Sequence, residues 1–103
     1  MYIVTVLFKI HPSQHQNFME AMHANAQTSL ATESGCKQFD VCEGEPGDGV
    51  VFLYEVYDSK DDFTAHLVAP HFVQFNAKTT PWVAHKQVQT FYRHTAPGIS
   101  SKA

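Results

Sequence analysis

Two residues of this sequence have the side-chain chemistry of a proton acceptor and an orienting partner. His66 lies between Phe63 and Leu67 in a segment with helical spacing, so its imidazole is expected to point inward. A neutral imidazole there can take a proton from a phenolic hydroxyl near physiological pH. Glu55 interrupts an apolar stretch, where a carboxylate is costly unless it is paired. We predict His66 and Glu55 as catalytic residues, with Glu55 accepting a hydrogen bond from His66.

Both residues also have structural interpretations. His66 could be a core or rim histidine whose ring is satisfied by one backbone carbonyl. Glu55 could form an ion pair with Lys37 or Lys86 within the sheet or across a dimer. The residue types alone leave these alternatives open.

A polar end follows an apolar start along one side of the first predicted helix. Phe18, Met22, Asn25 and Ser29 are separated by four, three and four residues, so they share a face. A polar group facing a core is unfavourable unless it is hydrogen-bonded. Asn25 and Ser29 are therefore either substrate-binding residues of a cavity or edge residues that meet water or backbone.

Three further residues are candidates for contact with a substrate. His71 follows Pro70 at the start of a predicted helix, where its main expected role is to pack the helix junction. Tyr57 and Trp82 are expected in the core or in a pocket wall, because aromatic side chains more often pack than bind.

No metal site and no cofactor are predicted. His11 and His15 are four residues apart, but Pro12 separates His11 from the helix, and His66 and His71 are five apart across a break. Neither pair forms a set with carboxylate or cysteine ligands at a recognisable spacing. The sequence also has no glycine-rich dinucleotide loop and no phosphate-binding loop.

The first half of the chain must supply a strand and a long helix. Tyr2–Ile10 is almost wholly apolar, which predicts a strand covered on both faces. Ser13 and Gln16 form a capping-box pattern for a helix that runs to about Thr32. Gly35 is expected to end this segment in the left-handed conformation.

The second half of the chain alternates turn signals with short periodic segments. It predicts a hairpin of Cys36–Glu45 and Val50–Tyr57, helices over Ser59–Val68 and Pro70–Lys78, and a last strand over Val83–His94. The order is β-α-β-β-α-β, an α+β, ferredoxin-like arrangement with an antiparallel sheet and helices on one face. A second copy would cover the other face, giving a homodimer. Residues 1–95 form the predicted domain, and Ala96–Ala103 a flexible tail.

Composition excludes several classes of protein. A chain of 103 residues has room for one domain, and its net charge of −3 with no basic cluster argues against nucleic-acid binding. The longest apolar run, near Val50–Tyr54, is too short to span a membrane. Cys36 and Cys42 are six apart on one predicted strand and cannot form a disulfide. With no room for a signal peptide before the first strand, we expect a cytoplasmic protein.

Four stretches resemble the antibiotic biosynthesis monooxygenase family, over roughly residues 1–94. They are the opening strand with its Pro12 turn, Gly35–Val41, Leu53–Tyr57 and Phe63–Phe72, where His66 and His71 bracket Pro70. The resemblance implies a dimeric αβ-barrel. It is weaker for the reaction, because members of this family are similar in shape and diverse in chemistry.

The resemblance implies oxygenation of a small quinol or polyphenol-like substrate without flavin, metal or heme. A deprotonated hydroquinone can itself give an electron to O₂, so the protein must supply an apolar pocket, a proton acceptor and donors for an oxyanion. Asn25 and Ser29 would hold the substrate oxygen. The heme-degrading branch is disfavoured, since His66 and Asn76 stand at the positions of its tryptophan and proximal histidine.

Two alternatives to an oxygenase remain. The sequence is equally similar to the autoinducer-2-processing isomerases, on Asn25, Tyr54, Glu55 and the His66–His71 segment. That similarity implies isomerisation, or another proton transfer, on a small sugar-derived ketone. The second alternative is a non-catalytic dimer that binds a small aromatic ligand. Dependence on oxygen separates the two enzymatic hypotheses, and ligand binding without product formation marks the third.

Overall fold

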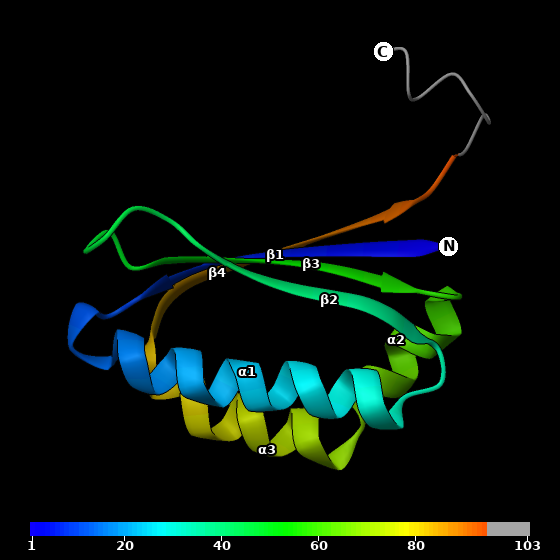
Figure 1. The fold of residues 1–103 in the computed structure, drawn as a ribbon, viewed down its shortest axis with the longest axis horizontal. Coiled ribbons are helices and arrows are strands. Elements are labelled where there is room, and N and C mark those ends of the chain that lie inside the picture. Colours follow the sequence, from blue (N-terminus) through cyan, green and yellow to red (C-terminus); the bar gives the residue numbers. More distant parts are fainter. Residues whose placement is uncertain (95–103) are drawn as a thin grey trace.

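The computed structural model describes residues 1–94, so the predicted tail Ala96–Ala103 lies outside the described residues. Four strands and three helices follow the predicted β-α-β-β-α-β order, with the second helical section divided in two (Figure 1). The elements are β1 (Tyr2–Ile10), α1 (His15–Thr32), β2 (Cys36–Glu43), β3 (Val50–Tyr57), α2 (Lys60–Leu67), α3 (Pro70–Thr79) and β4 (Val83–Tyr92).

The strands form one antiparallel sheet in the order β2-β3-β1-β4. All three helices lie on the same side of this sheet, with α1 and α3 side by side and α2 near the end of β3 (Figure 1). The expected α+β, ferredoxin-like fold is therefore confirmed.

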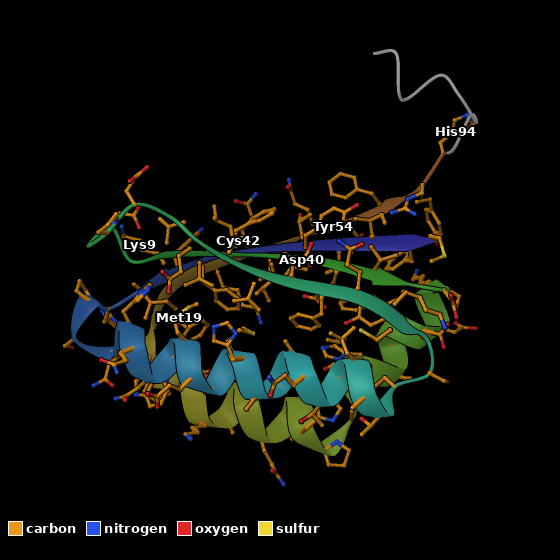
Figure 2. All side chains as sticks on the ribbon, in the orientation of Figure 1. Lys9, Met19, Asp40, Cys42, Tyr54 and His94 are labelled. Carbon is orange, nitrogen blue, oxygen red and sulfur yellow. The ribbon has the colours of Figure 1, made fainter. Side chains whose placement is uncertain are left out.

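The core lies between the helices and the even-numbered side chains of β1. Val4, Phe8 and Ile10 are buried on this face, and the ring of Phe8 packs edge-on against Phe18 of α1 with centroids 5.0 Å apart. Figure 2 shows Met19 between α1 and the sheet and Tyr54 on the opposite side.

The outer face of the sheet, for which the sequence predicts a cover by a second copy, is open in the single chain. Leu7, which points away from the helices, is 40% exposed, and its cross-strand neighbour Phe52 is 36% exposed. Phe91 of β4 is 48% exposed on the same face. No element of residues 1–94 packs on these side chains, because all three helices lie on the other side of the sheet.

Helix α1 ends at Thr32 as predicted, whereas its predicted start and the predicted conformation of Gly35 are corrected by the structure. A 3₁₀ turn over Pro12–Gln14 precedes the helix, whose N-cap is Gln14 without a side-chain hydrogen bond, so the capping box is not formed. Among residues 1–94 the positive backbone φ angles are those of Gly47 and Gly49, in the β2–β3 turn. Gly35 is required for space instead, since a Cβ there would overlap the Asp62 carboxyl at the start of α2.

The helix pair α2 and α3 begins and ends as the sequence predicts. The Ser59 hydroxyl accepts a hydrogen bond from the Asp62 backbone N–H at 3.2 Å and caps α2. Pro70 occupies the first position of α3, where its missing N–H costs no hydrogen bond. The short break between the two helices turns α3 back along α1 (Figure 1).

The two cysteines lie on the same strand. Cys36 and Cys42 are both free thiols on β2, and Cys36 is buried whereas Cys42 is exposed. Burial raises the pKa of the Cys36 thiol to about 11, so it stays protonated at neutral pH.

Within residues 1–94, no helix combines the length and apolar character needed to cross a bilayer.

Candidate functional site

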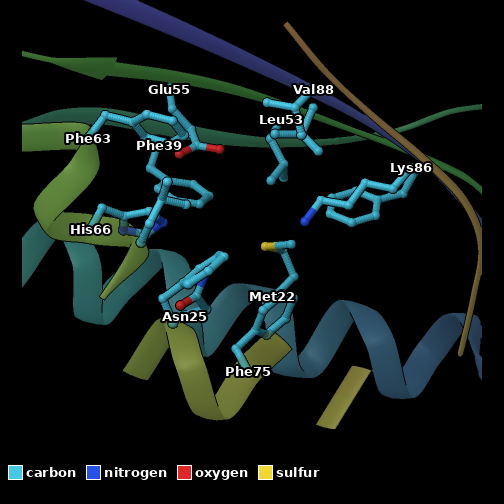
Figure 3. Close-up of a pocket in the computed structure, with 14 residues that line it drawn as sticks. Met22, Asn25, Phe39, Leu53, Glu55, Phe63, His66, Phe75, Lys86 and Val88 are labelled. Atoms are coloured by element: carbon cyan, nitrogen blue, oxygen red, sulfur yellow. The ribbon is translucent and has the colours of Figure 1, made fainter. Parts of the chain in front are cut away.

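A mostly apolar pocket lies between the sheet and the helices (Figure 3). It holds about 400 Å³ of space between side chains, including the part open to solvent. Its polar lining residues are Asn25 from α1, Glu55 from β3, His66 from α2 and Lys86 from β4. The apolar wall includes Met22, Phe39, Leu53, Phe63, Phe72 and Phe75. An apolar pocket with a few convergent polar groups is the usual form of a small-molecule site.

Asn25 lines this pocket and has an unsatisfied hydrogen-bond acceptor. The residue is only 5% exposed, and its Oδ1 has no hydrogen-bond partner within residues 1–94. An orphaned buried carbonyl costs free energy, roughly 1–3 kcal/mol, and is uncommon in folded proteins. A ligand hydroxyl or amine in the pocket would satisfy it.

Glu55 is held in the pocket by Tyr57. The two residues point to the same face of β3, and the Tyr57 hydroxyl donates a hydrogen bond to Glu55 Oε1 at 2.5 Å. Burial raises the pKa of Glu55 to about 7, although the Tyr57 hydrogen bond favours the charged form. Burial, together with Glu55, also raises the pKa of Tyr57, which therefore remains a hydrogen-bond donor.

Glu55 forms no hydrogen bond or ion pair within residues 1–94 with any of its three expected partners, His66, Lys37 and Lys86. Lys37 instead lies 3.4 Å from Asp58. The orienting carboxylate of His66 is Glu33, which follows α1, because the end of that helix reaches the end of α2. The predicted hydrogen bond between Glu55 and His66 is therefore replaced by two separate pairs, Tyr57–Glu55 and His66–Glu33.

His66 is a buried ring with one nitrogen turned toward a carboxylate. Its Nδ1 lies 2.9 Å and 3.1 Å from the two oxygens of Glu33. Burial lowers the pKa of His66, although Glu33 opposes that effect, so the ring is neutral at physiological pH. A neutral ring that donates from Nδ1 has its lone pair on Nε2. Nε2 is therefore the nitrogen that can accept a proton from a ligand.

The His66 ring is fixed by packing on several sides. The Phe72 ring centroid is 4.9 Å away, and the Phe63 ring is stacked on it with centroids 6.2 Å apart. Tyr57 also approaches it, at 5.6 Å between centroids. A ring held in this way keeps its nitrogens in fixed directions.

Ser29 and His71 support the site from behind the pocket. The Ser29 hydroxyl is fully buried and donates to the Asn25 backbone carbonyl at 2.9 Å. His71 Nε2 lies 2.6 Å from Glu33 Oε2 and 3.1 Å from Ser29 Oγ. Neither residue lines the pocket that contains His66, so the structure does not bring them into the predicted position for substrate contact.

Tyr57 and Trp82 also lie away from the pocket lining. Tyr57 is fully buried behind the pocket, where it donates its hydrogen bond to Glu55 and packs against the His66 ring. Trp82 is in a 3₁₀ turn that follows α3, and it borders a separate surface groove beside Asn17 and Lys78. Pro81 turns the chain at this point, which places Trp82 near the start of α1.

Lys86 adds a positive charge near the rim of the pocket. Its Nζ lies 5.5 Å from the centroid of the Phe8 ring and 6.0 Å from that of Phe72. Burial lowers the pKa of Lys86, and the charge of Glu55 partly offsets this. The aliphatic stem packs on the aromatic wall while the ammonium group can face a developing anion.

Glu33 is the residue of the site that the sequence interpretation missed. The spacing along the sequence could have indicated Glu33, because it follows Ser29 by four residues and continues the helix stripe of Met22, Asn25 and Ser29. Within residues 1–94, Glu33, His66 and His71 place one potential ligand atom each within 4.8 Å of one another. This group could hold a metal ion, which the spacing of the histidines alone did not predict.

A model of the antibiotic biosynthesis monooxygenase family matches residues 1–78. The chain belongs to this family. The match covers the opening strand, α1, both hairpin strands and the segment that carries His66 and His71. Membership in the antibiotic biosynthesis monooxygenase family supports a general monooxygenase or small-ligand-binding role.

Solved structures assigned to the antibiotic biosynthesis monooxygenases share the fold at low sequence identity. One from Nitrosomonas europaea is 23% identical with a TM-score of 0.84, covering 90% of this chain and 98% of its own. One from Caulobacter crescentus CB15 is 21% identical with a TM-score of 0.86, covering 91% and 90%. One from Deinococcus radiodurans is 19% identical with a TM-score of 0.86, covering 96% and 98%. No protein of curated function matches the sequence.

Proposed function

We propose that the protein is a cofactor-independent monooxygenase of a small quinol or polyphenol-like substrate. The observation that supports this most directly is Asn25, which lines the same apolar pocket as His66 and Glu55 and whose buried Oδ1 has no hydrogen-bond partner within residues 1–94. A phenolic substrate has an apolar ring for the walls and a hydroxyl that can donate to this oxygen. Family membership supports the general class of reaction.

Proton transfer is assigned to the pair of His66 and Glu33. The substrate hydroxyl gives its proton to His66 Nε2, and the resulting imidazolium is stabilised by the Glu33 carboxylate at Nδ1. Lys86 lies on the same pocket and stabilises the phenolate that forms. The phenolate is more electron-rich than the phenol and can reduce O₂.

The overall reaction needs no external reductant. One oxygen atom of O₂ enters the ring and the other leaves as water. The quinol supplies all four electrons, two when a ring C–H becomes C–OH and two when the diol becomes the quinone, so the product is a hydroxyquinone. The aromatic wall confines the ring, and Asn25 fixes one hydroxyl, so the reacting carbon is held in one orientation.

A second candidate function is isomerisation of a small hydroxyketone. The observation in its favour is that a carboxyl with a pKa raised to about 7 and a neutral histidine line one pocket. Two such groups can remove a proton from one carbon and return it to the neighbouring one. This reaction consumes no O₂.

The test is turnover of a menadiol-type quinol with and without oxygen. We expect O₂ uptake and hydroxyquinone formation by the wild type above the rate of spontaneous oxidation. His66→Ala should lower turnover about 100-fold or more, because it removes the proton acceptor. Asn25→Leu should lower it as well, while retaining the fold, because it removes the polar group that orients the substrate.

His23→Ala is the matched control, since His23 is an exposed histidine on α1 outside the pocket. Equal turnover by wild type and His66→Ala would remove His66 from the mechanism. A thermal shift on ligand binding with no product in any condition would favour a non-catalytic binding protein. Turnover of a hydroxyketone at the same rate under nitrogen would favour the isomerase.

A homodimer is also part of this proposal. The exposed Leu7, Phe52 and Phe91 give the outer face of the sheet an apolar surface that a second copy of the chain would bury. Such a dimer, located in the cytoplasm, is consistent with the two free thiols.

A further inference from the structure

Three metal-ligating side chains meet where the three helices approach one another. Glu33 follows the end of α1, His66 lies in the last turn of α2 and His71 in the first turn of α3. Two histidines and one carboxylate form a ligand set that proteins use for zinc and other divalent first-row metals. We propose that Glu33, His66 and His71 bind one such ion, with Zn²⁺ as the reference member of the class.

The distances between the ligand atoms are close to those required. His66 Nδ1 and His71 Nε2 lie 2.9 Å and 2.6 Å from the same oxygen, Glu33 Oε2. All three ligand atoms fall within 4.8 Å of one another. Bonds of about 2.0–2.2 Å to a tetrahedral ion require ligand atoms roughly 3.3–3.5 Å apart. An outward movement of under about 1 Å would therefore admit the ion.

Burial makes this cluster different from a chance surface group. The His66 side chain is 2% exposed, that of Glu33 14% and that of His71 19%. A carboxylate held between two imidazoles in this setting benefits from any positive charge that replaces the shared protons.

The cluster is also accessible from one side. His71 borders a surface groove between α1 and α3, together with Thr28 and Gln74. An ion could enter from this groove and keep a water ligand on that side. Three protein ligands with one open position are the usual arrangement of a zinc ion that is not purely structural.

An ion at this position would act on the pocket through His66. When Nδ1 binds a metal, the proton of the neutral ring resides on Nε2, which then cannot accept another. The ion would inhibit the oxygenase reaction, a consequence that rests on the proposed function, whereas the binding itself does not. Binding without inhibition would retain the metal site and remove His66 as the proton acceptor.

Titration of the untagged protein with Co²⁺ tests the site by visible absorption. We expect one Co²⁺ per chain, with bands typical of nitrogen and oxygen ligation that disappear when Zn²⁺ is added. Glu33→Gln keeps the shape of the side chain, and His71→Gln changes a half-buried position. Each substitution should weaken Co²⁺ binding about 100-fold. If circular dichroism shows that Glu33→Gln is unfolded, Co²⁺ binding by His71→Gln tests the site.

His23→Gln serves as the control for adventitious binding to an exposed imidazole. It should bind Co²⁺ with wild-type affinity and stoichiometry. The proposal is overturned if the wild type binds less than one ion per chain at saturation. It is equally overturned if His71→Gln retains full affinity, or if His23→Gln weakens binding as much as His71→Gln does.

Discussion

Burial shifts the pKa values of two side chains of the pocket in opposite directions. It raises the pKa of Glu55 to about 7 and lowers that of His66, because the charged form of each loses hydration. His66 is therefore neutral near physiological pH, whereas Glu55 populates both its protonated and its charged form. A carboxyl that titrates near the working pH beside a neutral imidazole can exchange protons with a substrate.

Glu55→Gln should change the pH dependence of stability. The pKa of Glu55 is ordinarily 4.5 and is about 7 in the folded protein. The contribution of protonated Glu55 to the free energy of unfolding is therefore complete below pH 4.5 and is lost as the pH rises through about 7. The glutamine variant lacks this loss. Its free energy of unfolding relative to wild type should therefore rise by roughly 3 kcal/mol between about pH 4 and pH 8.

Urea denaturation of both proteins across this range measures the effect. The comparison between variant and wild type cancels the opposite contribution of His66, which favours folding at higher pH. A difference that stays constant with pH would mean that folding does not shift the pKa of Glu55.

The sequence identifies individual site residues when they break a pattern. Asn25 interrupts a helical stripe and Glu55 interrupts an apolar strand, and both line the pocket. The pairing of His66 with Glu33 could not be predicted, because it depends on how the end of α1 meets the end of α2. Periodicity gives the face of one element and does not give the distance between two.

At the scale of elements, hydrophobic periodicity and turn residues were sufficient to predict the order of the strands and helices. The bounds of β1 and β3 agree with those predicted, since Pro12, the glycines of the hairpin and Ser59 are strong local signals. The start of α1 and the role of Gly35 were predicted less well, because Ser13 lies in a 3₁₀ turn and Gly35 has a tertiary role. Contacts between distant elements are not encoded in local spacing.

Gly35→Ala tests this tertiary role. The added methyl group would overlap the Asp62 carboxyl, so β2 and the start of α2 must separate. We expect a loss of about 1–3 kcal/mol in the free energy of unfolding, measured by urea denaturation. In an Asp62→Ala background the same substitution should cost less, because the overlapping carboxyl is absent. An equal loss of stability in both backgrounds would mean that the destabilisation comes from the backbone at Gly35 and not from overlap with the Asp62 carboxyl.

At the scale of the whole molecule, the sheet has one covered and one open face. The helices cover the inner face, whereas Leu7, Phe52 and Phe91 are exposed on the outer one. Large exposed apolar side chains on one surface are typical of an interface. The fold was predictable at this scale because the element order admits few arrangements, and the assembly depends on a second chain.

Leu7→Glu should convert a dimer to a monomer. The substitution places a carboxylate at the centre of the apolar surface, next to Phe52 and twice in a symmetric dimer. Light scattering coupled to size-exclusion chromatography should show half the wild-type mass. Val73→Glu is the control, because Val73 is 53% exposed on α3, away from the sheet. The same mass for wild type and Leu7→Glu would contradict this interface.

The position of β4 at the end of the strand order has a consequence for the pocket. Lys86 and Val88 lie on this edge strand and also line the pocket, and both are exposed. A neighbouring chain that docks along β4 would therefore form part of the pocket entrance. Substrate selection would then be shared between the two docked chains.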